Sequence, residues 1–96
     1  MSHFNALTPA QDERLALIAE EAAEVIQAIT KIQRHGLYSH HPESGILNKH
    51  SLENELGDLH TAVRIAVNAG DLDALKIDAA AKRKARNVGR YLHHLS

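Results

Sequence analysis

The N-terminal third of the chain has the hydrophobic and polar pattern of one long helix. Thr8 can cap its start, Pro9 suits the first helical position, and Gln11 completes a capping box. After His35, Gly36 offers a left-handed stop. Between these signals one apolar stripe follows the helical period through Leu15, Ile18, Ala22, Val25, Ile26, Ile29 and Ile32.

A second helix is predicted after a loop. The stretch GLYSHHPESGILN has neither helical nor strand periodicity, and its length suits a binding loop. Asn48 or Ser51 can cap the next helix, which should end near Ala69 with Gly70 as its stop. Its core side is predicted to consist of Leu52, Leu56, Leu59, Val63, Ala66 and Val67.

A third helix is predicted to begin at Asp71 or Asp73 and to run almost to the C-terminus. The chain has no strand signal and no internal repeat, and its 96 residues suit one domain. The pattern therefore predicts a single all-α domain over residues 1–96, built from three main helices.

Composition narrows the class of protein. The net charge of -1 gives the whole molecule no bias towards nucleic acid or an anionic membrane. The absence of cysteine excludes disulfides and thiol-bound metals. No apolar run approaches the roughly 18 residues of a membrane span, and the N-terminus does not have the pattern of a signal peptide. A cytoplasmic domain without a membrane segment is the expectation.

Two pairs of carboxylates are the main candidates for chemistry. In EEAAEVIQA, Glu21 and Glu24 are three residues apart, and in ENELGDLHTA the same spacing separates Glu55 and Asp58. Residues three apart share a helical face. On a helical wheel, Glu21, Glu55 and Asp58 fall at the edge of an apolar face, where a carboxylate needs a cation or hydrogen-bond donors. Four such groups suit Mg²⁺, which prefers oxygen ligands; the alternative is two solvated helix faces.

Two other groups of polar residues allow less definite interpretations. The stretch KRKARNVGR, from Lys82 to Arg90, is rich in cations and has no acid. It can interact with the dipole at a helix C-terminus, or it can hold phosphates opposite the carboxylates. The histidines lack a convincing spacing for zinc ligands.

Together these motifs resemble a known family. Glu20-Glu21-x-x-Glu24 followed by Glu55-x-x-Asp58 resembles the E-E-x-x-E and E-x-x-D signature of the MazG-like, all-α nucleoside triphosphate pyrophosphatases. RHGLYSHHPESGILN before LENELGDL, and KARNVGRY near the C-terminus, resemble segments of the small phage and bacterial members. The resemblance covers about residues 12–92.

The resemblance implies a role for each matching residue. Glu21, Glu24, Glu55 and Asp58 would hold Mg²⁺, with Mn²⁺ as a substitute. Glu20, together with Glu21, would belong to the catalytic group, as an outer-shell ligand or by orienting the attacking water. Contacts to the triphosphate or sugar would come from Lys84, Asn87, Arg90 and Tyr91. Because the chain has few aromatic residues, recognition of the base would rest on polar groups such as Asn48.

The resemblance also implies an activity and an assembly. Water would attack the α-phosphorus of a nucleoside triphosphate, with dGTP as a first guess, and release a monophosphate and pyrophosphate. A homodimer or homotetramer around a four-helix-bundle-like core would cover apolar helix surface, and no stable nucleic-acid complex is expected. Two alternatives remain: a related hydrolase such as a phosphoribosyl-ATP pyrophosphatase, and a non-enzymatic helical module that binds a protein or nucleic acid through Lys82 to Arg90.

Overall fold

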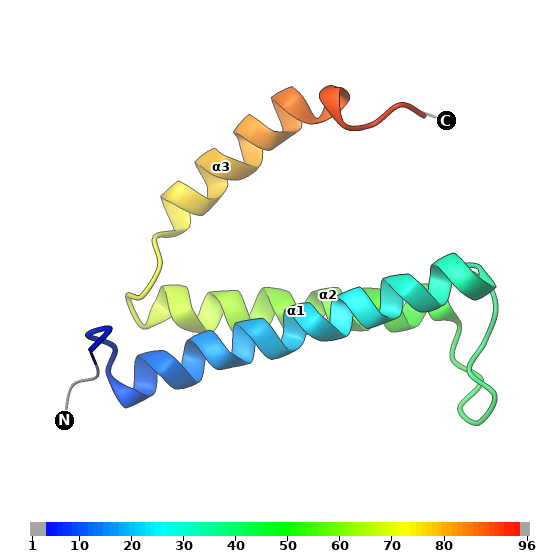
Figure 1. Ribbon diagram of the computed structural model, residues 1–96, viewed down its shortest axis with the longest axis horizontal. Helices are drawn as coiled ribbons and strands as arrows, with labels where there is room; N and C mark the ends of the chain where they lie inside the picture. The colour runs from blue at the N-terminus through cyan, green and yellow to red at the C-terminus, as the bar shows by residue number, and fades with distance from the viewer. Residues whose placement is uncertain (1–3, 95–96) are drawn as a thin grey trace.

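Three helices form most of the chain in the computed structural model, which describes residues 4–94 (Figure 1). They are α1 (Pro9–His35), α2 (Asn48–Asn68) and α3 (Ala74–Asn87), and a 3₁₀ turn, η1 (Val88–Arg90), follows α3. Within residues 4–94 no β-strand forms, and one isolated antiparallel bridge joins His40 to Leu47. The prediction of an all-α fold with three helices is confirmed.

The ends of α1 are set by the expected signals. The Thr8 side chain accepts a hydrogen bond from the backbone N–H of Gln11 at 3.1 Å, and the Gln11 side chain accepts one from the backbone of Thr8 at 3.0 Å. Gly36 follows the last turn with a φ of 91°, a conformation that L side chains rarely adopt. Its N–H donates to the carbonyl of Ile32. The predicted bounds of this helix are therefore confirmed.

The cap predicted for α2 is wrong. Leu47 occupies the N-cap position, without a side-chain hydrogen bond to the helix. Asn48 is used by the loop instead: its side-chain amide donates to the carbonyl of Gly36 and its backbone N–H donates to Ser39. Asn48 therefore stabilises the loop, although the local sequence pattern predicted that it would cap α2.

The third helix begins as one of the two alternatives predicted, and it ends early. Asp73 caps it by accepting a hydrogen bond from the N–H of Leu75 at 2.9 Å. Regular α-helix stops at Asn87 and tightens into η1, short of the predicted end. Gly89 lies in this turn, and glycine is unfavourable by about 1 kcal/mol in a helix interior.

Helices α1 and α2 form an antiparallel hairpin and pack against each other along their length (Figure 1). Four side chains are buried between them, three of which are alanine: Val25, Ala28, Ala62 and Ala66. Small side chains permit close approach of two helices. At the open end of the hairpin, Arg14 donates to both oxygens of Asp71, at 2.5 and 3.1 Å, and ties α1 to the turn after α2.

The apolar stripes are only partly buried, which corrects the predicted core. Val25 and Ala66 are buried, but Ile26 and Leu56, assigned to the core sides of the two helices, are 62% and 47% exposed. Each helix of the hairpin has one packing partner, so only a narrow strip of each is covered. That strip lies to one side of the predicted stripe and is centred on alanines.

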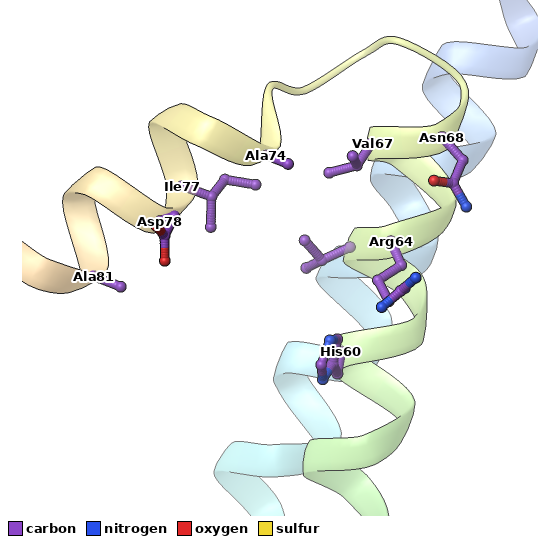
Figure 2. Close-up of a pocket in the computed structure, with 9 residues that line it drawn as sticks. His60, Arg64, Val67, Asn68, Ala74, Ile77, Asp78 and Ala81 are labelled. Carbon is purple, nitrogen blue, oxygen red and sulfur yellow. The ribbon is translucent and has the colours of Figure 1, made fainter.

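Helix α3 diverges from the hairpin after the turn that follows α2 (Figure 1). None of its residues is buried, and Leu75 is 79% exposed. Where α3 leaves the hairpin, an open groove of about 550 Å³ lies between it and α2 (Figure 2). Val67 on one side and Ile77 on the other contribute to its largely apolar lining. No helix in the described part of the chain is long and apolar enough to cross a lipid bilayer.

Candidate metal centre

Two carboxylates lie inside the contact between α1 and α2. At 100° per residue, Glu21 falls between the buried Val25 and Ala28 around the axis of α1. On α2, Glu55 falls in the same way between the buried Ala62 and Ala66. The strip that joins the two helices therefore carries acids as well as alanines. This explains why the covered strip differs from the apolar stripe.

Three carboxylates converge at this point. One oxygen each from Glu21, Glu24 and Glu55 lies within 4.8 Å of the other two, and all three residues are half-buried. The hairpin of a single chain therefore brings together three of the four acids paired in the sequence, and Asp58 is not among them. Glu24, which the helical wheel placed further from the apolar face than Glu21, belongs to the group.

Two of these carboxylates have an unpartnered oxygen. The Oε2 atoms of Glu21 and Glu55 are buried without a hydrogen-bond partner. A buried polar atom without a partner carries the cost of its lost hydration, and a charged one more so. Such an atom on each helix, with both helices facing one point, is the strongest sign that this point suits a positive charge.

The pKa values of Glu21 and Glu55 also show that their surroundings disfavour a negative charge. Burial raises the pKa of Glu21 above its ordinary value, and the nearby charges of Glu24, Asp58 and Glu20 raise it further. Close contact with the Glu24 carboxylate raises the pKa of Glu55, with burial as the next cause. Both shifts mean that the ionised form is disfavoured by its surroundings. A bound cation would remove that penalty.

The donor set fits a hard divalent cation. Carboxylate oxygens are the ligands that Mg²⁺ takes from proteins, and Mg²⁺ keeps further positions for water and phosphate oxygens. A pocket of about 290 Å³ opens beside the group and provides space for such ligands. It is lined by Glu24, Gln27, Ala28, Lys31, Ser51 and Glu55.

Asp58 and Glu20 lie at the margin of this centre. The helical wheel placed Asp58 at an apolar boundary, but its side chain is exposed, because no element within residues 4–94 packs on that side of α2. Its charge still raises the pKa values of Glu21 and Glu55, so it is close enough to act on them. Glu20 is exposed and lines a different pocket, with Leu17 and Ile65 among its neighbours.

The predicted phosphate-binding residues of the C-terminal segment lie on α3 and just beyond it. Lys84 and Asn87 belong to α3, and Arg90 ends η1. The ammonium of Lys84 lies 4.1 Å from the ring centre of Tyr91, a cation–π contact. Because α3 diverges from the hairpin, the single chain does not bring these residues to the carboxylates (Figure 1).

Sequence reasoning missed one residue at the centre, Lys31. It lines the same pocket as Glu24 and Glu55, and it also lines a pocket of about 390 Å³ at the end of α1 that contains Asn48. The signal was available in the sequence: Lys31 follows Glu24 by seven residues, which is two helical turns on the same face.

Comparison with known protein families gives one match. A family model described as the MazG nucleotide pyrophosphohydrolase domain matches residues 10–90. The match includes all the acids of the centre and the C-terminal basic segment, and it confirms the resemblance drawn from the paired acids. Searches of curated proteins and of solved structures give no match.

Proposed function

The chain belongs to the MazG nucleotide pyrophosphohydrolase family, and we propose that it is a Mg²⁺-dependent enzyme that hydrolyses a nucleoside triphosphate to a monophosphate and pyrophosphate. One observation carries the proposal beyond the family: two buried, unpartnered carboxylate oxygens within a group of three acids. Among possible substrates, dGTP is the first to test.

Glu21, Glu24 and Glu55 would hold the metal, with Asp58 as a further ligand from the exposed side of α2. When bound, Mg²⁺ or Mn²⁺ would neutralise phosphate oxygens and lower the pKa of a coordinated water. The residues themselves supply the rigid hairpin on which this geometry depends. The buried alanines around the acids, Ala28, Ala62 and Ala66, allow the two helices to pack closely there.

The reaction is a single displacement at phosphorus. The oxygen of a water molecule forms a bond to the α-phosphorus, and the bond from that phosphorus to the oxygen bridging to the β-phosphorus breaks. The bridging oxygen leaves with the electron pair as part of pyrophosphate. The proton of the attacking water passes to a carboxylate and then to solvent. Glu20 is proposed to orient this water or to act as an outer-shell ligand, from its exposed place beside Glu21.

The remaining substrate contacts are proposed to come from the C-terminal segment of a second copy. Lys84, Asn87, Arg90 and Tyr91 lie away from the carboxylates of their own chain, and α3 has no buried residue. Exposed apolar side chains occur on all three helices, Ile26, Leu56 and Leu75 among them. Surface of this kind is what an oligomer covers. We therefore propose a homodimer or homotetramer in which α3 of one copy packs on another.

The direct test is product analysis. The purified protein is incubated with each common dNTP and NTP, with Mg²⁺ and separately with EDTA, and the products are resolved by anion-exchange chromatography. Monophosphate and pyrophosphate in equal amounts, with no reaction in EDTA, are expected. In ¹⁸O-labelled water the label should appear in the monophosphate, because water attacks the α-phosphorus.

Other outcomes have distinct meanings. Diphosphate and orthophosphate would place the attack at the terminal phosphate. No turnover of any common nucleotide, combined with hydrolysis of phosphoribosyl-ATP, would move the chain to the related hydrolase. Turnover that persists in EDTA would contradict the metal dependence.

A further inference from the structure

A basic pocket lies at the closed end of the hairpin, beyond the carboxylates. It has a volume of about 390 Å³ and lies where the last turns of α1 meet the loop between α1 and α2. Its lining contains two permanent cations and three histidines, and none of its lining residues is acidic. The lining is Lys31, Arg34, His35, Ser39, His40, His41, Pro42 and Asn48.

The two cations are available for a ligand. Within the part of the chain that the structure describes, neither Lys31 nor Arg34 forms an ion pair with a carboxylate. The basic side chains at the start of α2 behave differently: Lys49 and His50 both pair with Glu53. The charge of the pocket is therefore not neutralised by its own surroundings.

The loop that forms the other wall is held in place by hydrogen bonds. The backbone N–H of His41 donates to Ile46, that of Asn48 to Ser39 and that of Lys49 to Leu37, at 2.8 to 2.9 Å. The Asn48 amide adds a bond to the carbonyl of Gly36. A wall built in this way is ordered before any ligand arrives, which lowers the cost of binding.

One of the histidines is fixed in a form that donates. The Nδ1 atom of His41 accepts the backbone N–H groups of Glu43 and Ser44, at 3.2 and 3.4 Å. With Nδ1 as an acceptor, the proton of the neutral ring lies on Nε2, which is then a donor. Together with the cations, this gives the pocket hydrogen-bond donors of the kind that phosphate oxygens accept.

The basic pocket and the pocket beside the carboxylates share one lining residue, Lys31. This side chain lines both pockets, while Glu24 lines only the acidic one and Arg34 only the basic one. Along α1, the half-buried acids Glu21 and Glu24 are thus followed by the bases Lys31 and Arg34. A chain of phosphates that starts at the carboxylates and extends towards the loop would meet Lys31 first.

We propose that the basic pocket binds the β- and γ-phosphates of the substrate and then the pyrophosphate that leaves. The inference rests on the proposed hydrolysis of a nucleoside triphosphate, and it specifies the direction of the substrate. The terminal phosphates point towards Arg34 and the loop, and the nucleoside points the other way along the hairpin. Asn48 then contacts phosphate rather than the base.

Two different roles for these residues lead to different results. Arg34 and His35 lie in the last turn of α1, where cations interact favourably with the helix dipole. If that is their only role, the two residues stabilise the helix and the pocket binds no ligand. Recognition of a base by Asn48 requires a nucleobase and gives inorganic pyrophosphate no special affinity. Binding of pyrophosphate without a nucleoside or a metal separates all three.

The experiment is isothermal titration of the full chain with inorganic pyrophosphate, in EDTA and at low ionic strength. Wild type should bind, and Arg34→Gln should weaken binding about tenfold or more, because it removes charge-assisted hydrogen bonds. Arg83→Gln is the matched control: it removes the same charge from an exposed residue of α3 that lines neither pocket. Glu55→Gln should bind pyrophosphate at least as tightly as wild type, because it removes a negative charge nearby.

The proposal is overturned if wild type does not bind pyrophosphate, or if Arg34→Gln and Arg83→Gln bind it equally well. Equal affinity for orthophosphate would also overturn it, because the pocket is argued to hold two linked phosphates. Nucleotide turnover, measured on the same proteins, keeps the proposed function separate. If pyrophosphate binding depends on Arg34 but no triphosphate is hydrolysed, the proposed function is rejected and the phosphate-binding pocket is retained. If a triphosphate is hydrolysed but pyrophosphate does not bind in this way, the proposed function is retained and the pocket is rejected.

Discussion

The hairpin of α1 and α2 and the third helix differ in how much of their chemistry a single chain completes. In the hairpin, packing brings three carboxylates within 4.8 Å of one another. Helix α3 carries cations and apolar side chains, but it has no buried residue and diverges from the hairpin. The difference teaches that one chain alone assembles the group of acids proposed to bind metal, whereas the role of α3 depends on what covers it.

The largest effect is expected from the acids in the hairpin. Glu55→Gln and Glu21→Gln should each reduce turnover about a thousandfold, because each removes a charged group proposed to hold the metal. Both should raise the melting temperature in EDTA, since they remove repulsion between half-buried carboxylates. The measurements are steady-state kinetics and thermal melting.

Glu53→Gln is the control for this pair. Glu53 lies on the exposed side of α2, and it pairs with Lys49 and His50. Its variant should keep the turnover of wild type. Full activity in Glu55→Gln would show that the centre is only a helix contact.

The next effect concerns the surface of α3. Leu75→Lys should weaken self-association at least about tenfold, because it puts a charge on surface proposed to be covered by a second copy. Light scattering across a concentration series measures the mass, and turnover should fall as the oligomer dissociates. Lys76→Gln, on the same helix, should leave both unchanged. A wild-type monomer at all concentrations would remove α3 from the site.

A smaller effect is expected from pH. The pKa values of Glu21 and Glu55 are raised above 4.5 in the folded chain, so the folded state holds these protons more tightly than the unfolded state. This contribution to stability is present below pH 4.5 and is lost as pH rises through the raised values. In EDTA, the melting temperature should therefore fall above pH 4.5. Glu21→Gln should reduce the fall, and saturating Mg²⁺ should oppose it at neutral pH.

The contribution of Asp71 to the stability of the fold depends on pH in the opposite direction. Its hydrogen bonds with Arg14 hold the pKa of Asp71 below its ordinary value of 3.8. That contribution is present above 3.8 and is lost as pH falls through the lowered value. Scans above pH 4.5 therefore report on the carboxylate centre rather than on this pair. A melting temperature that rises between pH 4.5 and neutrality in EDTA would contradict the proposed repulsion.

The smallest effects should come from the helix caps. Thr8→Ala removes the cap of α1 and should cost about 1 kcal/mol, or about 4 to 8 °C in melting temperature. In the Leu75→Lys background, where α3 is uncovered, Asp73→Ala should leave the main transition nearly unchanged. Its effect should be confined to faster hydrogen exchange of α3 amides. Thr8→Ser is the control that keeps a capping hydroxyl. Equal losses from both caps would mean that α3 folds with the hairpin.

The parts of the fold that local chemistry determines were predictable. Thr8, Gln11 and Gly36 set the bounds of α1 because caps and left-handed stops act over a few residues. Spacing also singled out Glu21, Glu24 and Glu55, the three acids that converge in the hairpin. The packed side of each helix could not be predicted, since a helical wheel does not reveal how many partners cover an apolar stripe. Ile26 belongs to the predicted apolar stripe but is exposed, whereas Ala28 lies outside that stripe and is buried.

Long-range features of the site could not be obtained from local patterns either. The departure of α3 depends on the turn after α2, where Asp71 binds Arg14, 57 residues away in sequence. The basic pocket combines Arg34 with a loop whose backbone hydrogen bonds join Asn48 to Ser39 and Lys49 to Leu37, a pairing that no local pattern of the sequence indicates. Its helical half could be read from the sequence, since Lys31 lies about two turns and Arg34 nearly three turns beyond Glu24, but its loop half could not.

Metal binding to the nucleotide-free protein tests the central claim most directly. Mn²⁺ is titrated into wild type, Glu55→Gln and Glu53→Gln, and free Mn²⁺ is followed by electron paramagnetic resonance. We expect saturable binding to wild type, competition by Mg²⁺, loss of binding in Glu55→Gln and retention in Glu53→Gln. Equal binding by Glu55→Gln and wild type, or no saturable binding by wild type, would contradict a metal centre in the hairpin.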